Sequence, residues 1–275
     1  MFIKPPLKWA GNKYKILSHI IPLIGTPKIY CEPFGGSLSV ALNVKAQQYI
    51  LNDINKDLYY LYTNIDFDFI NECRALFTRE NNTRESYDRI RTEFNQSTDP
   101  RERALKFLYL NKHCFNGLSR YNSKGEFNVP YGRKSKSNDK ILPANFPEKA
   151  LLDFIATFKL KQVKFHNTSF NDEILYSSLG LGDMVYFDPP YFPLTQTSNF
   201  TKYAETDFGY LQQVELVSIA EKLSSKGIRV IISNHDIPET RNLYHKAQII
   251  PIQVQRNISA NSSSRKKVNE LIAIF

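Results

Sequence analysis

Short apolar runs alternate with amphipathic segments at both ends of the chain, which is typical of an α/β protein. Leu216, Ile219, Ala220 and Leu223 follow helical spacing and predict a helix that stops at Gly227. The runs that predict strands are residues 28–31, 48–51, 162–165, 183–187 and 228–232, with 248–255 and 271–275 as a final antiparallel pair.

Between residues 55 and 158 helical spacing replaces the strand pattern. Residues 83–94 carry Tyr87, Ile90 and Phe94 on one face. Asp99 and Pro100 form an N-cap and a first helical position, and this helix is expected to run to about residue 112. We therefore predict a Rossmann-like α/β domain with a mixed sheet, made of residues 1–54 and 160–275. A mainly helical domain of residues 55–159 is inserted into it.

The strand predicted at 183–187 runs into Asp188-Pro189-Pro190-Tyr191. The prolines exclude helix, so the chain leaves the strand in an extended shape that offers carbonyl oxygens, a carboxylate and a flat ring. Ligands bind at the carboxyl ends of strands in open α/β sheets. The cluster suits a planar group with an exocyclic amine, although an ordinary proline-rich turn is the alternative for these four residues alone.

The first predicted strand is followed by Glu32-Pro33-Phe34-Gly35-Gly36-Ser37, and a helix capped by Ser37 is expected over residues 37–44. The glycines do not follow GxGxxG, which argues against a dinucleotide site. The second strand ends at Asn52-Asp53, where a carboxylate can accept hydrogen bonds from ribose hydroxyls. Together these signals favour a ligand that contains adenosine. Trp9, near Gly11, is either part of a ligand site or structural.

Composition narrows the functional classes. The chain has 275 residues, a formal charge of +9, 42% hydrophobic and 13% aromatic residues, and three cysteines without a CxxC pair. Zinc and a disulfide framework are therefore not expected. Positive charge with many aromatic rings suits a protein that holds phosphates and stacks on bases. The first residues lack a signal-peptide pattern and no apolar run is long enough to cross a bilayer, so we expect a cytoplasmic, nucleoid-associated protein.

A hairpin with its turn at Ser123-Lys124-Gly125 is predicted within the helical block. Phe115 could be a wedge between base pairs, and Arg120 could read a guanine edge. Lys112, Arg133, Lys134 and Lys136 could meet phosphates. The alternative is a solvated basic hairpin over a buried Phe. Residues 192–209, with Phe200 and Tyr203, are long enough for a lid, and the basic run 256–267 is either a phosphate grip or a surface turn.

In their order along the chain, these segments resemble those of the Dam-type DNA adenine methylases, over nearly the whole sequence. The resemblance implies a class I methyltransferase fold, transfer of a methyl group from S-adenosylmethionine to N6 of adenine in double-stranded GATC, and no metal. The segments are 7–11, 32–36, 115–118, 120–122, 125–130, 188–191, 233–236 and 265–268.

The same resemblance implies roles for individual residues. Asp188, Pro189, Pro190 and Tyr191 would form the catalytic motif. The cofactor residues would be Trp9, Lys13, Phe34, Gly35, Asp53, Ser169, Phe170 and Asp188. Lys8, Leu118 and Arg120 would contact bases and Phe115 would intercalate, and the DNA-binding set also includes Lys112, Asn116, Pro130 and Arg133. We expect the protein to be a monomer in solution.

Three residues depart from the family pattern: Asn12 and Leu38 stand where glycines are usual, and Phe115 where tyrosine is common. We expect Asp188 and the Pro189 carbonyl to accept the N6 hydrogens of a flipped adenine, so that the nitrogen lone pair faces the methyl donor. A non-catalytic DNA-binding protein and an adenine methylase acting on RNA are the alternatives. A hydrolase and a zinc deaminase are disfavoured because GxSxG and PCxxC motifs are absent.

Overall fold

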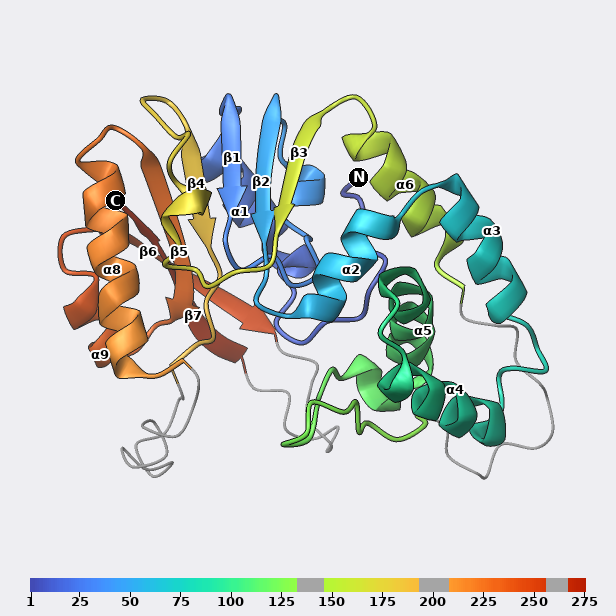
Figure 1. The fold of residues 1–275 in the computed structure, drawn as a ribbon. Coiled ribbons are helices and arrows are strands. Elements are labelled where there is room, and N and C mark those ends of the chain that lie inside the picture. The colour runs from blue at the N-terminus through green and yellow to red at the C-terminus, as the bar shows by residue number, and fades with distance from the viewer. Residues whose placement is uncertain (133–145, 193–207, 256–266) are drawn as a thin grey trace. The chain divides into compact units, whose positions relative to one another are not determined.

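The computed structural model describes residues 1–132, 146–192, 208–255 and 267–275 (Figure 1). The chain divides into two compact units. The first consists of Met1–Leu17, Gly36–Asn43 and Asp53–Asn167, and the second of Ser18–Gly35, Val44–Asn52 and Thr168–Phe275. The predicted domains differ from this division, because they placed segments 1–17 and 36–43 with residues 160–275. The assignment of residues 55–159 as an inserted recognition domain stays a prediction.

A mixed seven-stranded sheet forms the α/β part, in the order β3-β2-β1-β4-β5-β7-β6. The pairs β1–β2, β1–β4 and β4–β5 are parallel, whereas β5–β7 and β6–β7 are antiparallel. The Rossmann-like mixed sheet and its final antiparallel pair are thus confirmed. The strands are β1 (Ile29–Glu32), β2 (Gln48–Asn52), β3 (Gln162–His166), β4 (Met184–Phe187), β5 (Arg229–His235), β6 (Gln248–Gln255) and β7 (Lys267–Ile274).

The central strands of the second unit lie in its core along their whole length. Every residue of β1 and of β4 is buried, as expected of parallel strands covered on both faces. Leu216 and Ala220 of α8 pack in one cluster with Val185 of β4 and Val230 of β5. The remaining elements of this unit are α1 (Leu17–Ile24), η4 (Glu173–Leu175), α8 (Tyr210–Ser224) and α9 (Pro238–Leu243).

The first unit is mainly helical, and side-chain caps set several of its helix starts. Asn55, Asp66, Thr83 and Asp99 each accept a hydrogen bond from a backbone N–H in the first turn of the following helix. The helices predicted at 83–94 and from 99 to 112 are confirmed. The helices are η1 (Tyr14–Ile16), α2 (Lys56–Asn64), α3 (Phe67–Leu76), α4 (Arg84–Gln96), α5 (Pro100–His113), η3 (Phe115–Gly117) and α6 (Glu148–Phe158).

Two local predictions need correction. The helix expected at residues 37–44 is wrong: only the single turn η2 (Ala41–Asn43) forms there. Leu38 has φ 56°, a left-handed conformation that cannot continue a helix and explains why glycine is usual at this position. The hairpin around residues 123–125 has the expected turn, with Gly125 N–H donating to the Asn122 carbonyl at 2.9 Å. Its limbs are joined by the isolated bridge Tyr121↔Phe127 rather than by regular strands.

Candidate functional site

The Asp188–Tyr191 segment begins where β4 ends. Pro189 is buried, Asp188 and Tyr191 are half-buried, and Pro190 is exposed. The strand β4 lies between β1 and β5, so the strand order reverses at the β1–β4 pair. Such a reversal is the point at which the loops after two neighbouring parallel strands diverge and leave a crevice for a ligand. The chain therefore delivers Asp188 and the Phe34-Gly35 segment after β1 to the same edge of the sheet.

Side chains from α8 and β5 fix the backbone around Tyr191. Gln213 donates from Nε2 to the Pro190 carbonyl at 2.8 Å, and Asn234 Oδ1 accepts from the Phe192 N–H at 3.2 Å. Asn234 Nδ2 in turn donates to the Tyr244 hydroxyl at 2.9 Å and to Gln213 at 3.3 Å. Gln213, Asn234 and Tyr244 are all buried. This network holds the peptide groups on both sides of Tyr191 without using backbone strain.

Tyr191 keeps a neutral hydroxyl. Its ring meets His235 edge to face at 4.9 Å, and its hydroxyl donates to Glu270 Oε2 at 3.3 Å. Burial, followed by the negative charges of Asp188 and Glu270, holds the pKa of Tyr191 well above its usual range. The phenol therefore stays protonated at neutral pH and presents an uncharged stacking surface.

An aromatic wall forms from loops that follow different strands. Phe34 stacks on Phe170 with ring centroids 5.4 Å apart, and Phe208 meets Phe34 edge to face at 5.5 Å. Asn52 ties the loops together, because its side chain donates to the carbonyls of Pro33 at 2.9 Å and Thr168 at 3.0 Å. The predicted cofactor residues Phe34 and Phe170 are thus in direct contact.

Gly35 and Ser169 complete this group of predicted residues. The Gly35 N–H donates to the Asn52 carbonyl at 2.7 Å, which fixes the loop after β1 on the end of β2. Ser169, beside Phe170, is exposed. Both residues therefore belong to loops that the Asn52 backbone and side chain hold in place.

In the first unit, Trp9 and Asp53 meet at Gly36. A Cβ added to Gly36, whose φ is +48°, would lie 2.8 Å from Trp9 Nε1, so the indole packs directly on the glycine backbone. Asp53 accepts from the Gly36 N–H at 2.8 Å and from the Asn55 N–H at 2.9 Å. Burial raises the pKa of Asp53 despite these two bonds. Lys13 is buried, and its Nζ donates to the Gly11 carbonyl at 2.6 Å.

Lys8 lies against the turn that carries the predicted wedge. The Lys8 Nζ donates to the Lys112 carbonyl at 3.1 Å. A Cβ added to Gly117 would lie 2.3 Å from the Cβ of Lys8, so the Lys8 side chain packs directly on this glycine. Phe115 is 45% exposed, and its N–H donates to the Pro130 carbonyl at 2.9 Å. Burial and the charge of Lys8 lower the pKa of Lys112 to about 8. The structure thus brings Lys8, Lys112, Phe115 and Pro130 together.

The remaining predicted DNA contacts lie nearby in sequence. Asn116 adopts φ 56°, and the Leu118 carbonyl accepts from Cys114 Sγ at 3.3 Å. Arg120 is exposed, and its Nε donates to Asn128 Oδ1 at 2.8 Å. Three sets of predicted residues lie outside the described ranges: Arg133 with Lys134 and Lys136, the expected lid with Phe200 and Tyr203, and residues 256–266.

Nearly the whole chain is matched by known proteins. Residues 9–258 match the model of the D12 class N6 adenine-specific DNA methyltransferase family. The chain belongs to this family. It is 43% identical over 275 residues to a DNA adenine methylase of Escherichia coli K12, covering 98% of this chain and 94% of that protein. It is 42% identical over 273 residues to a DNA adenine methylase of Serratia marcescens, covering 98% of this chain and 97% of that protein. It is also 42% identical over 273 residues to one of Vibrio cholerae, covering 98% of this chain and 95% of that protein.

Family membership confirms the fold, the reaction and the methyl donor inferred from the sequence. The chain is an adenine-specific DNA methyltransferase that uses S-adenosylmethionine, on a Rossmann-like class I methyltransferase fold. In the second unit, the Phe34–Phe170 wall suits the apolar parts of this cofactor. In the first unit, the buried Asp53 carboxylate is an acceptor of the kind that binds ribose hydroxyls. The cofactor supplies an activated methyl group, so the protein needs no nucleophile of its own.

Residues 1–132, 146–192, 208–255 and 267–275 contain neither a membrane-spanning helix nor a cluster of metal ligands. None of the helices in these ranges has both the length and the apolar content needed to cross a bilayer. Nor do three His, Cys, Asp or Glu side chains come together there as metal ligands would.

Sequence reasoning missed the residues that support this methyltransferase's site. Gln213 carries no motif signal of its own. Asn234 lies in segment 233–236, but the resemblance gave it no supporting role, although it follows the apolar part of β5, next to β4 in the sheet. A second missed group is Asp57 with Arg103 and Tyr121 in the first unit. One of its sequence signals is a carboxylate in the first turn of a capped helix, which most often complements the helix dipole. The other is the place of Tyr121 in segment 120–122, and neither signal links the three residues.

Proposed function

We propose that this methyltransferase modifies N6 of an adenine flipped out of double-stranded DNA at GATC. The observation that carries the proposal is the position of Asp188 at the β1–β4 switch point, with the half-buried Tyr191 beside it. Flipping is required because N6 cannot reach a methyl donor while it is paired in the duplex, and extrusion costs a few kcal/mol.

Asp188 and Pro189 act on the amine. The Asp188 carboxylate and the Pro189 carbonyl accept hydrogen bonds from the two N6 hydrogens. These bonds draw the nitrogen towards tetrahedral geometry and direct its lone pair at the methyl group. Pro190 supplies no N–H, so this stretch of backbone presents acceptors alone. Tyr191 stacks on the extruded base. The proton lost from N6 leaves through Asp188 to solvent, and no covalent enzyme intermediate forms.

The cofactor roles follow the contacts in each unit. Phe34, Gly35 and Phe170 border the methionine and adenine parts, with Ser169 at the edge of the same wall. Asp53 holds the ribose hydroxyls, and its hydrogen bonds from Gly36 and Asn55 leave lone pairs on both oxygens for them. Trp9 closes over Gly36, and Lys13 lies close to the carboxyl group of the cofactor.

The DNA roles belong to the segment after α5. Phe115 enters the stack beside the target adenine, and Lys8, Leu118 and Arg120 contact the bases of the site. Lys112 and Arg133 bind phosphates, while Asn116 and Pro130 shape the turn that presents Phe115. The exposure of Phe115 and Arg120 supports these assignments. The free enzyme is a monomer in solution.

The catalytic assignment is tested by Asp188→Ala on a duplex that contains GATC. Incorporation of labelled methyl groups should fall at least about a thousandfold, since an essential electrostatic contact is lost. Binding of the same duplex, followed by fluorescence anisotropy, should change less than about threefold. Wild-type turnover in this variant would refute the role of Asp188.

Sequence specificity needs a separate experiment. The enzyme is expressed in cells that lack adenine methylation, and modified adenines are mapped by single-molecule sequencing. Modification confined to GATC is the expected result. Modification at another sequence would refute the proposed site while leaving the reaction unaffected, and modification of RNA alone would refute the DNA substrate.

A further inference from the structure

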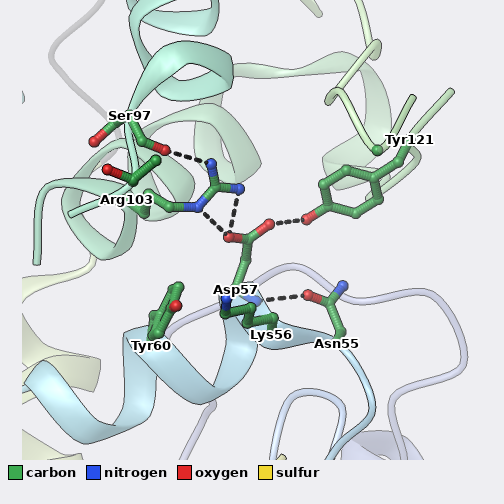
Figure 2. A pocket seen from close by; sticks show the side chains of 9 residues that line it. Asn55, Lys56, Asp57, Tyr60, Ser97, Arg103 and Tyr121 are labelled. Atoms are coloured by element: carbon green, nitrogen blue, oxygen red, sulfur yellow. Dashed lines mark hydrogen bonds and ion pairs between the residues drawn. The ribbon is translucent and has the colours of Figure 1, made fainter. Parts of the chain in front are cut away.

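Three elements of the first unit converge on the Asp57 carboxylate. Asp57 lies in the first turn of α2, Arg103 on α5, and Tyr121 on the limb that also carries Arg120 (Figure 2). Arg103 donates to Asp57 Oδ1 from Nε at 2.9 Å and from Nη2 at 2.8 Å, and the Tyr121 hydroxyl donates to Oδ2 at 2.7 Å. Both carboxylate oxygens are therefore engaged by separate parts of the chain.

Arg103 is itself held in a fixed orientation. Its Nη1 donates to the carbonyls of Phe94 at 3.0 Å and Ser97 at 2.9 Å, at the end of α4. Its guanidinium carbon lies 4.2 Å from the centre of the Phe94 ring. The Asp57 and Arg103 side chains are only 6% and 17% exposed. A planar fork with this many fixed partners sets the position of Oδ2, the oxygen that Tyr121 meets.

The turn beyond Tyr121 depends on a small number of attachments. Gly125, at its tip, lines a cavity of about 480 Å³ together with Asn55, Lys56 and Thr98. The Phe127 limb is attached by Asn95, which accepts from the Phe127 N–H at 2.8 Å and donates to its carbonyl at 3.2 Å. The other limb, which carries Arg120, is attached through the Tyr121 hydroxyl.

That attachment controls the direction of Arg120. Neighbouring side chains of an extended segment point to opposite sides, so a Tyr121 side chain held on Asp57 turns Arg120 outwards. Asn128, across the turn, completes the orientation. Its backbone N–H donates to the Arg120 carbonyl at 3.1 Å, and its Oδ1 accepts from the Arg120 Nε at 2.8 Å. Burial and the charge of Asp57 raise the pKa of Tyr121, so the hydroxyl remains a donor.

We propose that Asp57, Arg103 and Tyr121 form a positioning clamp that sets how strictly Arg120 discriminates guanine from other bases. This inference rests on the proposed function, in which Arg120 contacts a guanine of the site. The clamp residues do not touch the DNA bases. They act through Arg120, and their removal should therefore affect only those substrates on which Arg120 makes its contact.

The test variant is Tyr121→Phe, which removes one hydroxyl and keeps the ring against Phe127. Methylation is measured on a GATC duplex and on duplexes in which one G·C pair of the site is replaced at a time. We expect kcat/KM on GATC to fall at least about tenfold, as for loss of a hydrogen bond to a charged group. On the duplex that lacks the guanine read by Arg120 it should not change. Asp57→Asn should give the same selective loss.

Two comparisons separate the possible outcomes. Tyr109→Phe, which removes another buried phenol hydroxyl, bonded to the Asn81 carbonyl, should affect all duplexes alike. Arg120→Ala should lower kcat/KM about 5- to 150-fold on the GATC duplex and leave it unchanged on the duplex that lacks the guanine read by Arg120. Adding Tyr121→Phe to Arg120→Ala should lower kcat/KM no further. The clamp would be overturned if Tyr121→Phe lowered kcat/KM equally on every duplex, or did not lower it at all. It would also be overturned if the losses of Tyr121→Phe and Arg120→Ala added in the double variant. Arg120→Ala without selective loss would overturn the proposed reading of guanine, and the clamp with it.

Discussion

The Asp57 clamp and the Asp188 segment use the same residue types in opposite electrostatic surroundings. Asp57 is paired with the buried guanidinium of Arg103 and receives a tyrosine hydroxyl. Asp188 lies among negative charges: after burial, which is the main cause, the charges of Asp188, Glu32 and Glu270 raise the pKa of Tyr186. An acid paired with a cation holds the fold together. Acids gathered around one point create a negative region that suits a positively charged sulfonium and an amine donor.

The largest expected effect is on catalysis and tests the charge of Asp188 alone. Asp188→Asn keeps the shape of the side chain but removes its charge and replaces one acceptor oxygen with an NH2 group. That group is a donor, so it cannot accept a hydrogen bond from N6. We expect kcat to fall about a thousandfold, with the urea midpoint of unfolding unchanged. Single-turnover methylation measures the first quantity. A fall of less than tenfold would mean that Asp188 only shapes the site.

Removing the charge partner of Asp57 in the clamp should lower the stability of the fold. Arg103→Met keeps much of the side-chain volume and leaves the Asp57 charge buried without its cation. Breaking a buried pair in this way should lower the free energy of unfolding by about 3 kcal/mol. Urea unfolding followed by circular dichroism measures it. Arg74→Met, at the exposed pair with Glu148, is the control and should cost less than about 1 kcal/mol.

The network behind Tyr191 predicts a smaller effect. Gln213→Met removes the donor to the Pro190 carbonyl and should lower kcat about tenfold while the KM for DNA stays constant, because the acceptor cluster is misplaced rather than lost. Gln212→Met on the same helix is the control, since Gln212 bonds only the helix start at Gly209 among its described contacts. Equal kcat values in the two variants would show that the network is dispensable.

The comparison also shows what the sequence could predict. Strands, helices and the position of Asp188 follow from periodicity and from proline and cap signals, which act locally. The Asp57 clamp joins residues 46 and 64 positions apart, and no local pattern specifies such a pairing. The helix expected at 37–44 failed for a related reason. Burial of Leu38, Val40 and Leu42 stabilises a left-handed residue that intrinsic preference disfavours.

The smallest expected effect extends the contrast to cations. Lys112, like Asp188, lies beside a like charge, and its pKa of about 8 means that it is largely uncharged at pH 9 in the free protein. A DNA phosphate would restore the charge, so binding must take up a proton above pH 8 and should weaken about eightfold between pH 7.5 and 9. Anisotropy titrations measure this trend. Lys112→Arg should bind tightly with a flat profile, because arginine stays protonated, and Lys112→Met should bind weakly with a flat profile. The same pH dependence in all three proteins would mean that Lys112 does not meet a phosphate.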